Sequence, residues 1–579
     1  MTSLSPLSPP LTTTPQPVSR PAVEAPAAQH VPFAAFAFAG CDPQREARFR
    51  AEVDAAFPAT RWTAFNYGAR GVQGKERAEG ATVGWSEGTL TAATDLVGSA
   101  PMHVWSEGGA FIASTHLRPL ARAVHAAADP VGISQLLRHN FTLAGRTVFS
   151  GIRRLLGGQR FVHDGQSTRC EETSRLWANP ERAVPAGQSA LDRIWEALQA
   201  ALNSHVDAAP LGLMMSAGWD SRTLLAAAEV PLTAYTHGDL ASRELRITRE
   251  LCSSRNVPLH ESAISEDWFT PTFIQRDFAV TETATFPYWS AAGEHFAQLG
   301  VRGVLSGDFG EILGGHYLAA NQQQGGRKAL GVLFGLLGIH RESTSGSATL
   351  QTRLQSSKAM AFAPGLSDRD RLGEATAADV DWEFRRLQAR GVEGDDAFVE
   401  AFTTEHRGAQ WISGQPRSAA ARVEPVQPFL DVELLQLVTR IAPSKRTYNR
   451  LNRLLLQRHA PQLLRFATGA TVFACNAPML LQEASRMFVY ASERFSWTRH
   501  TRTGGVEAYR HYRWDDFEFL RDGRQLLNLV DDLKSPIWNV SALRRYLIGR
   551  FRKHSGHRRA YSVANEVLRI YGIDQLLRP

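Results

Sequence analysis

The stretch that decides the fold lies near the middle of the chain, where residues 211–225 read LGLMMSAGWDSRTLL. A short apolar run predicts a buried strand, the small residues Ser216–Gly218 follow it, and a helix is expected from Ser221. Small residues let a backbone approach a ligand closely, and the free N–H groups at a helix start attract phosphate. The order therefore predicts a phosphate or pyrophosphate site, although Asp220 or Ser221 could equally cap a helix that binds nothing.

Asp220 bears on the choice between a phosphate site and a simple helix cap, because its carboxylate would repel a bare phosphate. Carboxylate oxygens are typical ligands of Mg²⁺, which also binds phosphate oxygens. We therefore expect Asp220 to hold Mg²⁺ beside a nucleotide, with hydroxyl donors from Ser216 and Ser221.

A second motif follows another short apolar run, in residues 304–317, which read VLSGDFGEILGGHY. It places Ser306 and Gly307 at the strand end, and then two acidic residues, Asp308 and Glu311. Ligands of a parallel sheet bind beyond the carboxyl ends of its strands, so both motifs can face one nucleotide. We expect Asp308 and Glu311 to complete the Mg²⁺ site with Asp220.

The acidic pair can reach one metal only if the chain turns sharply between its members, and Phe309–Gly310 allows a tight turn. The alternative is that one carboxylate merely caps a helix near Ile312, where negative charge is favourable. The motif ends in Gly314–Gly315, which we interpret as a flexible pair.

Two kinds of pattern divide the chain. Short apolar runs broken by turn residues fill its first third and predict an antiparallel sheet, with strands at 31–40, 81–85, 103–105, 110–113 and 159–163. From Pro210 apolar runs alternate with helical stretches, which predicts a parallel sheet with strands at 211–215, 232–236, 258–260 and 303–306. Beyond Ala375 the pattern is mostly helical. The fold class is therefore α/β, with a β-rich antiparallel N-terminal domain and a parallel-sheet α/β domain that has a helical end.

The domain boundaries follow from composition. Residues 1–30 are rich in Pro, Ser, Thr and Ala and predict a disordered tail. We expect the first domain over 31–178, a linker at 179–187, and the second domain over 188–579 with a basic helical extension. The apolar stretch 329–339 is too short to span a membrane and predicts a buried helix.

Composition bounds the function only loosely. The 579 residues include 64 Lys and Arg against 57 Asp and Glu, so the net charge is 64 − 57 = +7. This mild excess suits anionic ligands without indicating nucleic acid. Four cysteines without a CxxC motif exclude a disulfide scaffold and a cysteine-rich zinc module. With no membrane span and no signal peptide in the pattern, a cytoplasmic location is expected.

The two motifs resemble those of the asparagine synthetase family. Its pyrophosphate motif S-G-G-x-D-S is matched by residues 216–221, and S-G-x-G-x-D-E-x-x-G-G is matched, one residue short, by residues 306–315. Residues 424–434 are similar to the family segment R-V-P-F-L-D-x-E-L, and residues 147–158 to a strand segment that closes its N-terminal domain.

This resemblance implies a glutaminase-like domain of the N-terminal-nucleophile type, followed by an ATP-pyrophosphatase domain that uses ATP and Mg²⁺. It implies nucleotide contacts from Leu213, Ser216, Gly218, Asp220, Ser221, Thr236, Ser306 and Gly307. It also implies catalytic roles for Asp308 and Glu311.

The chain departs from the family at two places. Glutamine-dependent members expose an N-terminal Cys, whereas here Thr2 follows Met1 and the first cysteine is Cys41, so the N-terminal domain is expected to be inactive. The family segment R-x-K-x-G-F should fall near residues 464–473, which contain no Lys. Lys445 or Arg465 could replace that lysine, and a solvated surface role is the alternative for each; Lys445 is our candidate.

Members without glutaminase activity include β-lactam synthetases and lasso peptide cyclases, and the chain looks more like the latter. That implies macrolactam formation in antibiotic biosynthesis: an Asp or Glu side chain of a precursor peptide is adenylated, and the peptide's N-terminal amine attacks it. The implied partners are the precursor peptide and a leader peptidase. Basic, aromatic C-terminal segments near Trp538 and Arg544–Tyr546, Arg550–Lys553 and His557–Arg559 could contact a peptide, or form a solvated helix face.

Three alternatives remain open from the sequence. The chain could be an ammonia-dependent asparagine synthetase-like ligase, a β-lactam synthetase-like ligase, or an inactive scaffold that binds a peptide.

Overall fold

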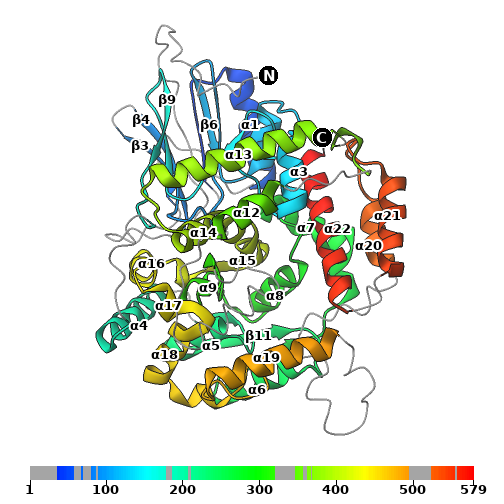
Figure 1. Cartoon of the computed structure of the whole chain (residues 1–579). Helices are drawn as coiled ribbons and strands as arrows, with labels where there is room; N and C mark the ends of the chain where they lie inside the picture. The colour runs from blue at the N-terminus through cyan, green and yellow to red at the C-terminus, as the bar shows by residue number, and fades with distance from the viewer. Residues whose placement is uncertain are drawn as a thin grey trace.

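The computed structural model describes most of the chain (Figure 1). The described residues are 35–57, 67–68, 80–86, 89–177, 186–205, 210–319, 346–355, 362–366, 368–494, 523–553 and 557–578. The predicted tail at 1–30, most of the predicted linker and the predicted helix at 329–339 lie outside these residues.

The N-terminal strands are antiparallel, as predicted, but they form two sheets and not one. One has the order β1 (Phe36–Ala39), β6 (Ala110–Ser114), β5 (His103–Glu107) and β7 (Arg153–Arg154). The other has the order β2 (Tyr67–Gly68), β3 (Ala81–Ser86), β4 (Thr89–Thr94), β8 (Gln159–His163) and β9 (Thr168–Glu172). Buried side chains from both sheets share one core, including Ala37, Phe111, Val83 and Phe161. The helices of this part are α1 (Pro43–Ala56), α2 (Leu117–Ala123) and α3 (Pro130–His139).

The second sheet system is the predicted parallel one. Its order is β12 (Leu259–Ser262), β11 (Leu232–His237), β10 (Leu211–Met214), β13 (Gly303–Leu305) and β14 (Glu424–Val426), and every pair is parallel. The four predicted strands are confirmed. The fifth, β14, was not predicted: it has three residues with Pro425 in the middle, and proline is confined to edge strands because it cannot donate to a ladder.

Helices connect these strands. Near the sheet lie α4 (Gln188–Asn203), α5 (Trp219–Ala227), α6 (Arg243–Ser254), α7 (Pro271–Thr281), α8 (Pro287–Gln298) and α9 (Gly310–Leu313). The helix predicted from Ser221 begins two residues earlier, because Gly218 is its N-cap. Short 3₁₀ turns lie at η3 (Glu266–Phe269), η4 (Pro364–Leu366), η6 (Pro428–Leu430), η7 (Thr447–Asn449) and η8 (Pro461–Arg465).

The rest of the chain is mostly helical, as predicted. After the sheet come α12 (Gly346–Gln355), α13 (Arg369–Ala389), α14 (Asp395–Thr403), the π-helix η5 (Thr404–Ile412), α15 (Gly414–Ser418), α16 (Val432–Thr439), α17 (Pro443–Arg446), α18 (Arg450–His459) and α19 (Met479–Arg494). The chain ends in α20 (Arg524–Asp531), α21 (Val540–Lys553) and α22 (His557–Leu577). Among the helices described here, none is long and apolar enough to cross a membrane.

The last three helices pack against the N-terminal part. Their buried residues Leu543 and Leu568 belong to one hydrophobic cluster with Phe36 of β1 and Ile133 of α3. Figure 1 shows α22 beside α3, where the Arg569 guanidinium donates to the Leu137 carbonyl (2.7 Å). The two ends of the chain therefore share a core.

Some of the predicted basic and aromatic residues contact other parts of the fold, whereas Arg545 and Tyr546 are exposed. Trp538 is buried. Arg544 pairs with Asp531, and Arg550 pairs with Glu566. These side chains therefore stabilise the helical end, which weakens their interpretation as a peptide-binding face.

Leu568→Ala tests the shared core. The side chain is 1% exposed, so its truncation should cost about 2–5 kcal/mol through lost burial and a cavity. Urea denaturation followed by Trp fluorescence would show an earlier midpoint. The control is Leu481→Ala on α19, where the side chain is 44% exposed and the change should stay within about 0.5 kcal/mol. Equal midpoints for the two variants would contradict the shared core.

Candidate functional site

Both sequence motifs meet at one point of the parallel sheet. After β10 the chain proceeds outward through β11 to β12, and it then returns to place β13 on the other side of β10. The loops after β10 and β13 thus diverge from neighbouring strands, which is the switch point where open parallel sheets bind ligands. We call residues 215–221 the first loop and residues 306–315 the second loop.

The first loop is organised by its own side chains. The Ser221 hydroxyl accepts from the Ser216 N–H (3.2 Å) and lies 2.9 Å from the Ser216 hydroxyl. The Gly218 N–H donates to that same Ser216 hydroxyl (3.2 Å). The Glu244 carboxylate of α6 accepts from the Ala217 N–H (2.7 Å). The loop amides are therefore oriented from within, and a phosphate would compete with these bonds.

The second loop packs directly on Asp220. A Cβ at Gly310 would lie 2.5 Å from the Asp220 Cγ, and one at Gly307 would lie 3.2 Å from the Asp220 Cβ. A side chain at Gly310 would therefore force Asp220 to move, and one at Gly307 would be tightly packed against it. Asp220 itself lies in the first turn of α5, and not before the helix as the sequence pattern indicated.

The predicted tight turn is present, and the residue with a positive φ in it is Phe309. Phe309 has φ 67°, a left-handed conformation that costs energy for a bulky residue. Its ring is buried and packs close to Gly408, which fixes the turn. Glu311 then falls inside α9, which begins at Gly310 and not near Ile312.

The three predicted carboxylates come together in the structure. Burial and the nearby Glu311 charge raise the pKa of Asp220 well above its usual value. Burial, Glu311 and Asp220 do the same to the pKa of Asp308, although a hydrogen bond from Ser306 opposes the shift. Burial also raises the pKa of Glu311. These side chains sense one another's charge, so they lie around a common space.

This arrangement fits a cation. Asp308 Oδ2 and Glu311 Oε2 are buried without a hydrogen-bond partner. As they stand, the His, Cys, Asp and Glu side chains of the described residues include no group of three or more that could hold a metal ion. Unsatisfied carboxylate oxygens that repel each other suit a Mg²⁺ ion that arrives with a nucleotide, because phosphate oxygens supply its other ligands.

The turn that carries Lys445 rests on the second loop. The neighbouring Arg446 forms a buried ion pair with Glu400 (2.6 Å) and donates to the Ile312 carbonyl (3.2 Å). Lys445 itself is exposed on α17, and Arg465 is also exposed. A Cβ at Gly315, at φ 66°, would lie 2.7 Å from the Thr447 nitrogen. The glycine pair therefore serves close packing, which corrects its interpretation as a flexible pair.

Arg222 is a residue of this region that the sequence analysis missed. Its guanidinium is fully buried in α5 and donates to the carbonyls of Ala217, Leu463, Phe466 and Ala467. It thereby ties the segment 463–467 to the first loop. A charged residue beside Thr223–Leu225, in an otherwise apolar helix, was the available signal.

Two predicted nucleotide residues differ in their placement. Thr236 lies at the carboxyl end of β11, where its neighbour Tyr235 pairs with Met214. Leu213 lies within β10, and its side chain is completely buried in the hydrophobic core. Thr236 therefore lies level with the first loop. Leu213 lies deeper, in the core beneath that loop.

Cys41 follows β1 in the N-terminal part. Its side chain is 8% exposed, and burial raises the pKa of its thiol to about 12. A thiol that stays protonated is a poor nucleophile. In this structure the thiol is therefore not activated, and the inactivity of the N-terminal domain stays a prediction.

The fold is α/β, and the two loops meet at the position where parallel sheets of this kind bind ligands. Residues 193–465, which contain all five parallel strands, match the family model described as Asparagine synthase. This segment is therefore similar to the asparagine synthase family. A comparison with curated proteins found no match.

Asp308→Asn tests the function of the carboxylates. The folded state raises this pKa above 3.8, so the contribution of Asp308 to stability is lost as pH rises through the folded-state value. At pH 8 the variant should therefore melt at or above the wild-type Tm, but lose nucleotide-dependent activity by about 100-fold or more. Calorimetry between pH 5 and pH 9, with activity assays at several Mg²⁺ concentrations, checks this. A lower Tm with normal turnover would mean a structural role.

Cys41→Ala tests the inactive N-terminal part. A buried, protonated thiol contributes no nucleophile, so the variant should turn over at the wild-type rate, and neither protein should release ammonia from glutamine. Ammonia release that disappears in the variant would restore the glutaminase hypothesis.

Proposed function

We propose that the protein is a lasso peptide cyclase, which activates an Asp or Glu side chain of a ribosomal precursor peptide with ATP and closes a macrolactam ring with the peptide's N-terminal amine. The observation that carries the ligase chemistry is the pairing of the two loops at the β10–β13 switch point, with three carboxylates around one space. The first domain over 31–178 and the second over 188–579 are part of this proposal.

The chain's own groups divide the work. Ser216, Gly218 and Ser221 bind and orient the phosphates, with Ser306 and Gly307 on the opposite wall and Thr236 at the end of β11. Asp220, Asp308 and Glu311 would hold Mg²⁺, which supplies positive charge against the departing pyrophosphate. The reaction joins the side-chain carboxylate to AMP, releases pyrophosphate, and then replaces AMP by the neutral amine.

Lys445 is proposed as the cation that stabilises the reacting groups. It lies on the turn that packs against the second loop, whereas Arg465 lies on the segment held by Arg222. A positive charge near the acyl carbon would stabilise the negative charge that develops as the amine attacks.

The surface of α19, which lies beside the segment that follows the Arg222 contacts, favours a peptide substrate. Gln482 and Ser485 of α19 bond to the backbone of Cys475 and Val472, so α19 is joined to the chain that continues from the Arg222 contacts. The same helix exposes Leu480 and Met487, at 60% and 61%. An apolar helix face of this kind suits peptide side chains better than a free amino acid.

A buried Cys41 also separates this proposal from glutamine-dependent amidation. With no glutaminase, the amine comes from the substrate or from free ammonia. The second candidate is therefore an ammonia-dependent or β-lactam synthetase-like ligase that uses the same two loops on a small molecule.

Exchange of labelled pyrophosphate into ATP tests the proposal. The substrate is a short peptide encoded beside this gene, supplied with a free N-terminus after removal of its leader. We expect exchange that depends on the peptide, and a product lighter by one water; Asp220→Asn should abolish both while its circular dichroism stays native. Peptide-independent exchange with aspartate and ammonium, yielding asparagine, would favour the second candidate. Absence of exchange with every substrate tested would indicate an inactive scaffold.

A further inference from the structure

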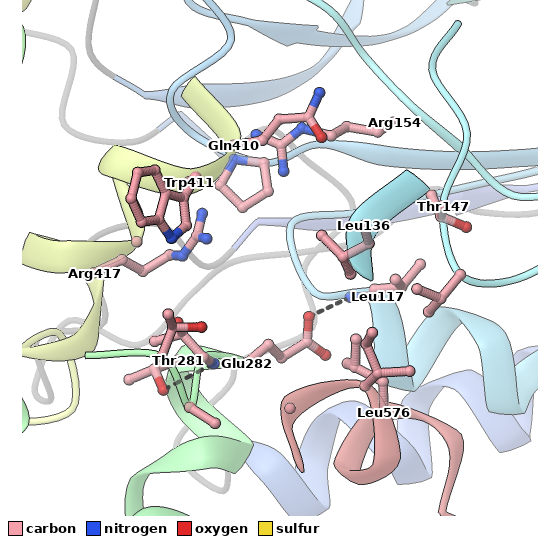
Figure 2. Close-up of a pocket in the computed structure, with 18 of the residues that line it drawn as sticks. Leu117, Leu136, Thr147, Arg154, Thr281, Glu282, Gln410, Trp411, Arg417 and Leu576 are labelled. Carbon is pink, nitrogen blue, oxygen red and sulfur yellow. Dashed lines mark hydrogen bonds between the residues drawn. The ribbon is translucent and has the colours of Figure 1, made fainter. Parts of the chain in front are cut away.

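A cavity of about 170 Å³ lies away from the two loops. It is enclosed by β5, α2 and α3 of the N-terminal part, by the connection between α7 and α8, by η5 and α15, and by α22. Figure 2 shows Arg154 and Arg417 entering it from different elements, with Trp411 and Gln410 beside them and Leu136 and Leu576 on the opposite side. None of its lining residues belongs to the first or the second loop.

Arg154 and Arg417 have no direct ion pair in the described fold, although the Asp95 charge acts on Arg154 and the Glu282 charge acts on Arg417. Among the described residues, no carboxylate lies within ion-pair distance, 4.0 Å, of either guanidinium. Arg154 donates only to the carbonyls of Gly98 (2.9 Å) and Ala409 (3.4 Å). Arg417 Nη1 is buried without a hydrogen-bond partner.

A third arginine of the same wall shows the contrast. Arg146 pairs with Asp379 (2.5 Å) and Asp129 (3.2 Å), so its charge is satisfied within the fold. The structural Arg222 is satisfied in another way, by four backbone carbonyls. Within the described part of the chain, Arg154 and Arg417 have no direct ion pair at the point where both reach open space.

The other titratable groups of the cavity leave this positive charge in place. The Glu282 carboxylate accepts from the N–H groups of Leu117 and Arg118, both at 2.7 Å, and Figure 2 shows it turned toward Leu117. Burial and the Arg154 charge hold the pKa of His103 well below its usual value. Burial also lowers the pKa of His116, which is therefore neutral near pH 7. Arg569 donates to a backbone carbonyl and meets no acid within the cavity.

We propose that this cavity binds the carboxylate group of a small ligand or a peptide end, held between Arg154 and Arg417. Guanidinium groups match a carboxylate with two parallel hydrogen bonds, and an anion would satisfy the unpartnered Arg417 nitrogen. The volume admits only a small group. Leu136 and Leu576 would contact its apolar part, and the Glu282 carboxylate nearby disfavours a multiply charged phosphate.

Calorimetric titration of the full chain provides the test. The probes are succinate for a free acid, N-acetylglycine for a peptide end, N-acetylglycinamide as its uncharged match, and inorganic phosphate. We expect at least one of the two carboxylates to bind and the amide not to bind. Succinate alone would indicate a free acid, and N-acetylglycine the end of a peptide. Absence of binding by both carboxylates, or equal binding of the amide, would overturn the proposal, as would tighter binding of phosphate.

Substitutions locate the site. Arg417→Gln and Arg154→Gln should each weaken carboxylate binding at least about tenfold, since a charge-assisted hydrogen bond is lost. The control is Arg160→Gln on β8, which removes the same charge from an exposed pair with Glu171 and should leave binding unchanged. Without ligand, Arg417→Gln should not lower the Tm, because a buried charge without a partner is costly. Binding that is equal in all three variants would also overturn the proposal.

Discussion

The contact between Asp220 and the second loop is the constraint on which the candidate site depends. Strands β10 and β13 are neighbours, so their loops must share the space beyond the sheet. Gly307 and Gly310 remove the side chains that would separate them from Asp220. The strained Phe309 turn and the buried Arg446–Glu400 pair then hold the second loop in that position. The result is a group of three buried carboxylates with raised pKa values, on which the Arg407 charge acts through Glu311.

A gathering of buried charges of one sign distinguishes the two regions where ligands are proposed. Other buried charges are satisfied within the fold: Arg386 contacts Glu383 and Glu405, and the Arg222 guanidinium donates to four backbone carbonyls. Around Asp308 negative charge accumulates, and around Arg417 positive charge does. Residual charge of this kind costs stability, and such costs are concentrated where a ligand of opposite charge is expected.

Much of the fold could be predicted because strands and turns leave local patterns. The antiparallel runs, four of the five parallel strands and both loops were found in this way. β14 was missed because its identity comes from pairing with β13, and not from its own three residues. The carboxylates of the site were predicted from residue type and from the adjacency of strand ends. The role of Arg222 and the cavity at Arg417 could not be predicted in this way, because each depends on segments more than 200 residues apart in the sequence. Examples are the contacts of Arg222 with Leu463 and of Arg154 with Ala409.

The shared core of the two chain ends also bears on how the protein is made. Phe36 leaves the ribosome early, yet the cluster that buries it includes Leu568 near the other terminus. N-terminal domains usually fold as they emerge during synthesis. Here α1 can cover Phe36 early, since its Phe49 contacts that ring, but the surface of α3 that meets α22 stays exposed until the last helix has been made. Such a chain depends on rapid closure of its ends, or on chaperones, to avoid aggregation before it is released.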